Sequence, residues 1–246
     1  ILLFISIIYN NIQYEKMTNC DQIILYLPTV KSISSLLRNY PEFHERWIMI
    51  HDNLTSLFRK DTLFNIISNK YYYPKPSSNC RYYIKPNSGS NGKNIQIVNK
   101  IPDGPIDGFT IVPEILTPFI KIDDIEYKYD YRVWIGIQKN LKYFICHNFI
   151  KRISMVPFAI NRTDGSLTNT SIYSNWQYHT DDNMYDKINN IVKDVLSLLT
   201  AINDNEINND KIMLTGWDFI ENQNNDIFLL EVNCDPSISI KHADLV

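Results

Sequence analysis

Alternating apolar and polar positions dominate the second half of this chain and predict β-strands there. Residues 127–137 read YKYDYRVWIGI, where Tyr, Val and Ile at every second position give the period of a half-buried strand. Comparable runs predict further strands and a closing strand pair around a polar turn. The predicted strands cover 23–29, 47–51, 81–86, 95–98, 110–116, 141–150 and 152–158, with the pair over 215–233.

Helical spacing of apolar residues occurs in two longer segments, 53–70 and 186–202. A shorter helix is predicted over 32–40, ended by Pro41. Two prolines in YYYPKPSS predict a boundary near residues 73–78. Strands and helices that are not strictly alternating, with hairpin-like strand pairs, indicate the α+β class, with a mostly antiparallel sheet in the second half.

Composition limits what the chain can bind. It has 246 residues, 44% hydrophobic and 21% charged, with a net charge of −3, which is typical of a globular protein without a basic field for nucleic acid or an anionic membrane. Four cysteines without CxxC spacing predict reduced thiols in an intracellular, cytoplasmic protein and no zinc site. The opening ILLFISII is too short to span a bilayer and is interpreted as a buried strand or the edge of a fragment.

Charged residues interrupt the strand over 127–137 on one face only. Alternation places Lys128, Asp130, Arg132 and Trp134 together. One interpretation is a solvated outer face with a ladder of opposite charges. The other is a charged strand that lines a cleft, which Trp134 on the same face favours slightly.

The segment IKPNSGSNGKNI combines a lysine at a strand end with a loop that holds two of the seven glycines. Backbone N–H groups of such a loop can approach phosphate oxygens while the Lys85 ammonium neutralises their charge. The spacing is not that of a Walker A loop. In isolation an ordinary Gly/Asn hairpin is the simpler interpretation.

Acidic and amide side chains end the last strand pair, TGWDFIENQNNDIFLLEVN. A four-residue loop over 222–225 predicts that Glu221 pairs with Asp226 and Asp218 with Leu229, so that Asp218, Glu231 and Asn233 converge. Hard oxygen ligands of this kind suit Mg²⁺. The alternative is strand-end charges that reach water, but the apolar neighbours of Glu231 predict burial, which costs several kcal/mol without a compensating cation or hydrogen bonds.

Taken in order along the chain, these pieces resemble the tubulin-tyrosine ligase-like family of ATP-grasp enzymes. The matching segments span about Arg59 to Ile238, and they are RKDTL, YYIKPNSGSNGKNIQIV, VPEIL, KYDYRVW, RISMVPF, SLTN, GWDF and LLEVNCDPSI. The resemblance implies an ATP-grasp fold with two α+β lobes clasping ATP. It divides the chain into a small N-terminal α/β region (1–75), a lid lobe with the phosphate loop (76–125) and a C-terminal lobe with the metal site (126–246).

The resemblance also implies roles for individual residues. Lys85 with the loop residues Ser88, Gly89 and Gly92 would contact the phosphates of ATP. The backbone of a hinge over 112–116 would hold the adenine, and Arg132 and Arg152 would face the γ-phosphate and an acyl-phosphate. The other nucleotide contacts that it implies are Glu114, Ile115 and Leu116 in the hinge, Lys128 and Asp130 near ribose and phosphates, and Asn169 near the phosphates. The implied catalytic residues are Arg132, Arg152 and Glu231. The implied Mg²⁺ ligands are Asp218, Glu231 and Asn233.

The implied activity is an ATP- and Mg²⁺-dependent ligase that joins a free amino acid to a protein carboxylate, acting as a monomer. Two alternatives remain: an ATP-binding protein without ligase activity that serves as an interaction module, and an ATP-grasp ligase for a small peptide or metabolite. Departures from the family pattern are Ser166, where a histidine is usual, and Pro113, which cannot donate a backbone N–H. The sequence ends at Val246, so we expect no basic docking extension, and tubulin is one candidate acceptor among others.

Overall fold

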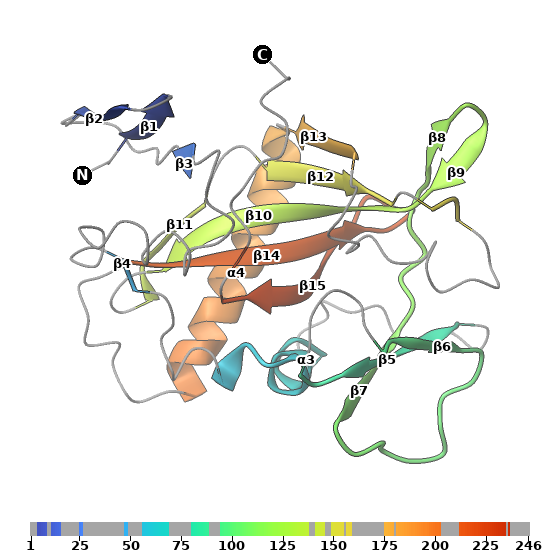
Figure 1. The fold of residues 1–246 in the computed structure, drawn as a ribbon. Coiled ribbons are helices and arrows are strands. Elements are labelled where there is room, and N and C mark those ends of the chain that lie inside the picture. Colours follow the sequence, from blue (N-terminus) through green and yellow to red (C-terminus); the bar gives the residue numbers. More distant parts are fainter. Residues whose placement is uncertain are drawn as a thin grey trace.

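A seven-stranded sheet forms the centre of the part of the chain that the structure, a computed structural model, describes (Figure 1). The described residues are 4–8, 11–15, 25–26, 47–48, 56–68, 80–88, 94–137, 141–145, 149–154, 156–158, 175–179, 181–202, 212–234 and 236. The strand order is β13-β12-β10-β14-β15, with β11 added to β10 and β4 to β14. All pairings are antiparallel except that of β4 with β14. The strands are β4 (Trp47–Ile48), β10 (Tyr129–Ile137), β11 (Tyr143–Ile145), β12 (Phe149–Ile153), β13 (Asn175–His179), β14 (Ile212–Glu221) and β15 (Ile227–Asn233).

Helix α4 (Asp182–Ile202) crosses one face of this sheet (Figure 1). The helix begins four residues before the predicted start at 186, because the Asp181 carboxylate accepts a hydrogen bond from the N–H of Met184 at 3.0 Å and caps the first turn. Its buried residues recur every three or four positions and pack on the apolar residues of β10, which confirms both predicted periods. The buried helix positions are Met184, Ile188, Ile191, Val192, Val195, Leu196 and Leu199.

A three-stranded sheet of order β6-β5-β7 lies beside the central sheet (Figure 1). Helix α3 (Lys60–Ser68) packs between β7 and α4, with Leu63 and Ile67 in the main core. The other described elements are β5 (Tyr82–Pro86), β6 (Gln96–Val98), β7 (Phe109–Pro113), the hairpin β8 (Ile120–Ile122) with β9 (Ile125–Tyr127), and an N-terminal sheet of β1 (Phe4–Ile8), β2 (Asn11–Glu15) and β3 (Leu25–Tyr26).

Several predicted boundaries are wrong. Residues 149–153 form one strand, so Arg152 lies near the end of β12 and not at the start of a strand. Strand β13 has no predicted counterpart, and the β8–β9 hairpin was missed because its turn is Asp123-Asp124 without glycine. Both aspartates adopt positive φ, 50° and 61°, which aspartate tolerates better than most residues.

The predicted register of the β14–β15 hairpin is also wrong. Glu221 pairs with Ile227, not Asp226, because the Asn222 side chain accepts the backbone N–H groups of Asn224 and Asp226, each at 2.8 Å, and closes a longer loop. A β-bulge then shifts the register between Asp218 and Phe219, so that Asp218 lies directly opposite Glu231. The two errors leave the predicted convergence of Asp218, Glu231 and Asn233 intact.

The sheet-rich architecture with few helices agrees with the predicted α+β class. The division at residues 75 and 125 stays a prediction. The predicted helix over 32–40 and the loop over 164–173 lie outside the described residues. Among those residues no helix is long and apolar enough to cross a membrane.

Candidate functional site

The face of the central sheet opposite α4 carries a cluster of buried charges. The cluster, here called the charged row, consists of Asp130 and Arg132 on β10, Arg152 on β12, Asp218 on β14 and Glu231 on β15. Asp130 pairs with Arg152, Arg132 with Asp218, and Asp218 with Glu231 across neighbouring strands. Asp130, Arg132, Arg152 and Asp218 are all buried. The interpretation of this face as a solvated outer surface is therefore wrong.

Two arginines neutralise the buried carboxylates of the charged row. Arg132 donates two hydrogen bonds to Asp218, one of them at 2.8 Å. Arg152 binds Asp130 in the same bidentate manner, one bond at 2.7 Å, and also reaches Asp218 at 3.1 Å. Bidentate arginine–carboxylate pairs fix both direction and distance. Asp130, Arg132, Arg152 and Asp218 thus form a connected network across three of the four strands that carry the charged row.

This network makes the free energy of unfolding depend on pH in the acid range. Burial by itself raises the pKa of the Asp218 carboxyl, but Arg132 and Arg152 lower it to about 2. A depressed folded-state pKa contributes stability above the unfolded value, and that contribution, on the order of 2 kcal/mol, is lost as pH falls from about 4 to about 2. We expect Asp218→Asn to flatten the pH dependence of the unfolding free energy in this window, whereas Asp103→Asn, an exposed control, leaves it steep. Equal slopes for the two variants would contradict the assignment.

The predicted metal ligands lie together at the end of the β14–β15 hairpin. The Asn233 amide donates to Asp218 Oδ2 and to Glu231 Oε1, both at 3.4 Å, and Lys60 Nζ lies 3.8 Å from Glu231 Oε2. No group of three or more His, Cys, Asp or Glu side chains that could hold a metal occurs in the described ranges. Any cation here would therefore depend on two carboxylates, the amide oxygen and ligands from outside the protein.

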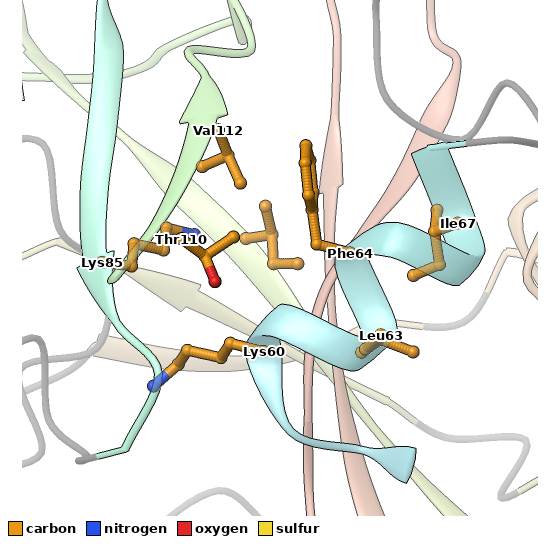
Figure 2. Close-up of a pocket in the computed structure, with 8 residues that line it drawn as sticks. Lys60, Leu63, Phe64, Ile67, Lys85, Thr110 and Val112 are labelled. Carbon is orange, nitrogen blue, oxygen red and sulfur yellow. The ribbon is translucent and has the colours of Figure 1, made fainter. Parts of the chain in front are cut away.

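A pocket lies between α3, β5, β7 and β15 (Figure 2), and its lysine Lys85 interacts electrostatically with Glu231 of the charged row. Lys60 from α3 and Lys85 from β5 reach into the same space, and Phe64, Val112 and Leu230 supply apolar walls. Burial and the Lys60 charge lower the pKa of Lys85, which Glu231 partly opposes. In the described part of the chain Lys85 Nζ makes no hydrogen bond or ion pair, and it lies 5.9 Å from the centroid of the Tyr83 ring. A partly buried ammonium of this kind suits an anion.

Lys60 has no predicted role, although its segment RKDTL is one of the resembling pieces. Sequence spacing does not reveal its partner, because Glu231 lies 171 positions further along the chain and meets it only through the packing of α3 beside β15. The signal that could have found it is the position of a lysine at the start of an amphipathic helix, facing the same side as buried Leu63.

The hinge residues take up different environments. Ile115 packs in a small core with Ile220 and Phe228. The Glu114 N–H donates to the Arg81 carbonyl at 2.7 Å, and the Leu116 carbonyl accepts from the N–H of Gln223 at 3.2 Å. The N–H groups of Ile115 and Leu116 make no hydrogen bond within the described ranges, so the hinge offers two backbone donors beside an apolar wall.

The Glu114 side chain joins the hinge to the central sheet. Its carboxylate accepts from Arg81 at 2.6 and 2.7 Å and from Lys128 at 2.9 Å. Burial alone would raise the pKa of Glu114, but Arg81 and Lys128 hold it below its usual value. Lys128, which is predicted to lie near ribose and phosphates, is therefore engaged with Glu114 and stacks over Phe158 at 5.2 Å.

Gly216 lets Arg132 lie close to the backbone of β14. A Cβ at this position would meet Pro236 Cβ at 2.7 Å and Arg132 Cδ at 3.1 Å. We expect Gly216→Ala to displace Arg132 from Asp218 and to lower the unfolding free energy by about 1–3 kcal/mol, the usual cost of overpacking. Gly104→Ala is the control, since no atom lies within 4 Å of its added Cβ. Urea denaturation measures both, and equal stability of the two variants would rule out the contact.

Other predicted residues are less constrained. Ser88 is exposed, while Gly89, Gly92 and Asn169 lie outside the described residues. Trp134 follows the charged row on β10 and pairs with Gly216, and its indole N–H is buried without a hydrogen-bond partner in the described structure. Such a donor normally finds a partner.

Comparison with family models gives one result. The model of the tubulin-tyrosine ligase family matches residues 55–215, more than half of the chain. The chain belongs to the tubulin-tyrosine ligase family. Curated proteins give no match.

Membership of the tubulin-tyrosine ligase family indicates an ATP-dependent ligase. The matched range includes α3, Lys85, the hinge and the β10 and β12 parts of the charged row. It ends at Thr215 within β14, before Asp218, Glu231 and Asn233. The assignment of these three as metal ligands therefore rests on their convergence in the hairpin and stays a prediction.

Proposed function

We propose that the chain is an ATP-grasp carboxylate–amine ligase that adds a free amino acid, of Tyr, Glu or Gly type, to a carboxylate of a protein acceptor. The observation that carries the proposal is the juxtaposition of Asp218, Glu231 and Asn233 with Lys60 and Lys85. Hard oxygen ligands beside cationic side chains suit a metal–phosphate complex better than either ion alone.

The order of residues along the strands gives the nucleotide a direction. The hinge N–H groups of Ile115 and Leu116 and the apolar group of Ile115, Ile220 and Phe228 suit the adenine. Asp218 is two residues from Ile220 along β14, so the phosphates would extend from there toward Gly216. Val112 and Leu230 of the pocket and the two lysines then flank the chain of phosphates.

The proposed reaction has two steps. An oxygen of the acceptor carboxylate attacks the γ-phosphorus of ATP, the bond to the β-phosphate oxygen breaks, and ADP leaves. The amine of the amino acid then attacks the acyl carbon, phosphate leaves with the C–O bond electrons, and the amine loses a proton. Arg132 and Arg152 would stabilise negative charge on the transferred group.

Magnesium fits the donor set only together with the nucleotide. Four cationic side chains, Lys60, Lys85, Arg132 and Arg152, share the region with the carboxylates of Asp130, Asp218 and Glu231. Mg²⁺ bound without phosphates would add to this excess of positive charge. When bound, Mg²⁺ would neutralise phosphate charge, and Asp218, Glu231 and the Asn233 amide oxygen would hold it, with the Asp218 carboxylate shared between the cation and the two arginines.

The test is nucleotide turnover by the purified protein with Mg-ATP, tubulin and a panel of labelled amino acids. We expect Mg²⁺-dependent ADP release coupled to incorporation of at least one amino acid. Reactions without Mg²⁺, and without acceptor, serve as controls. If ATP binds but no combination yields ADP or incorporation, the chain is a nucleotide-binding interaction module and the ligase proposal fails.

A further inference from the structure

Within the described residues, the two pocket lysines come from elements that share no backbone hydrogen bonds. Lys60 lies on α3 and Lys85 on β5, and the sheet of β5 is built from β6-β5-β7 alone. Both lysines line one pocket, where their positive charges repel. Apolar packing of α3 against β7 brings the two elements together, and a polar connection between them would fix the separation of the two lysines.

A chain of side-chain hydrogen bonds provides that connection. Thr110 Oγ1 on β7 donates to Asn87 Oδ1 at 2.6 Å, and Asn87 Nδ2 donates to Asp61 Oδ2 on α3 at 3.3 Å. Thr110 pairs directly with Lys85, and Asp61 directly follows Lys60. The backbone N–H of Asn87 is also fixed, by the Gly108 carbonyl at 2.9 Å. Each pocket lysine therefore lies beside one end of this series of hydrogen bonds: Lys85 is paired with Thr110, and Lys60 precedes Asp61.

We propose that Asn87 and Asp61 are positioning residues that hold Lys60 and Lys85 at the separation needed to bind one polyphosphate. The inference rests on the proposed function, because it takes a nucleoside triphosphate as the pocket's ligand. Asn87 uses its oxygen toward β7 and its amide nitrogen toward α3, so only a side chain with both an acceptor and a donor completes the connection. Neither residue touches the phosphates in this account.

Two substitutions at Asp61 separate positioning from electrostatics. Both Asp61→Asn and Asp61→Ala remove a negative charge near the pocket, which by charge alone favours anion binding. Asn keeps an oxygen that accepts from Asn87, whereas Ala does not. We expect Asp61→Asn to bind the analogue AMPPNP with Mg²⁺ at least as tightly as the unaltered protein. We expect Asp61→Ala to bind about tenfold more weakly than Asp61→Asn, the usual effect of one lost hydrogen bond.

An exchange of the two side chains gives an independent test. Asn87→Asp sets two carboxylates against each other and is expected to weaken AMPPNP binding by about tenfold. The double variant Asp61→Asn/Asn87→Asp restores a donor opposite an acceptor, keeps the net charge, and should bind within about twofold of the unaltered protein. Isothermal titration calorimetry of the full chain measures affinity, and the melting temperature of each variant shows whether it is folded.

The outcomes distinguish this inference from the proposed function. If the unaltered chain binds AMPPNP but Asp61→Ala equals Asp61→Asn, or if the double variant binds no better than Asn87→Asp, the positioning role is wrong and the ligase proposal stands. If the melting temperatures fall while the affinities stay equal, the connection is merely structural, which also overturns the inference. Absence of binding by the unaltered chain overturns the proposed function itself, and the positioning role with it. Asp103→Ala, exposed and remote from the pocket, should match the unaltered protein.

Discussion

Glu231→Gln is expected to lower Mg²⁺-dependent ADP release by at least roughly a hundredfold, while the protein remains folded. Glu231 is the directly opposed partner of Asp218 on the neighbouring strand, and two carboxylates held this close favour a bound cation. Gln keeps the shape of the side chain but removes the negative charge. Its effect on folding should be small, because the ion pair with Lys60 is long, 3.8 Å, and Gln can still accept the hydrogen bond from the Asn233 amide.

The control for this prediction is Glu126→Gln. Glu126 is exposed on β9 and forms a comparable long pair with Lys121, 3.9 Å, but lies outside the charged row. Steady-state ADP release over a range of Mg²⁺ concentrations, together with circular dichroism of both variants, separates loss of function from loss of fold. Undiminished turnover by a folded Glu231→Gln protein would remove Glu231 from the metal site.

Arg152→Met is expected to have the largest effect on stability. The substitution leaves the carboxylates of Asp130 and Asp218, with side chains 2% and 1% exposed, without their shared guanidinium. Removing one partner of a buried pair costs about 3–5 kcal/mol, because the remaining charge stays buried and uncompensated. Met fills a similar volume, so the loss reports on charge and not on packing.

Chemical denaturation measures this effect, with Lys100→Met as the control. Lys100 pairs with Asp103 at 3.4 Å, but both side chains are largely exposed, and the expected change is within about 0.5 kcal/mol. A cost below about 1 kcal/mol for Arg152→Met would mean that Asp130 and Asp218 find other compensation, and the account of the charged row as a buried network would fail.

The predictable part of the fold is the part that local periodicity controls. Alternation in YKYDYRVWIGI predicts which side chains of β10 face the core, and the apolar spacing of 186–202 predicts α4, because one period determines one buried face. The convergence of Asp218, Glu231 and Asn233 was also predicted. The pairing behind it was not, since an asparagine-stabilised loop and a β-bulge each change the count without altering the apolar pattern.

The unpredicted part depends on contacts between distant segments. Alternation cannot tell a solvated charged face from a buried one, because that depends on whether Arg132 and Arg152 find Asp218 and Asp130 on neighbouring strands. The role of Lys60 beside Glu231 likewise needs the packing of α3. The Asp123-Asp124 turn is not predicted, because both residues adopt positive φ values and the segment contains no glycine to indicate a turn.

The most direct test of the central claim, that this site binds a metal–nucleotide complex, is calorimetric titration of the chain with AMPPNP in the presence and absence of Mg²⁺. The cation excess around Lys60 and Lys85, together with Glu231 and Asn233, predicts measurable nucleotide binding that tightens when Mg²⁺ is present, and little or no binding of Mg²⁺ alone. Tight binding of Mg²⁺ without nucleotide, or the absence of nucleotide binding under both conditions, would contradict it.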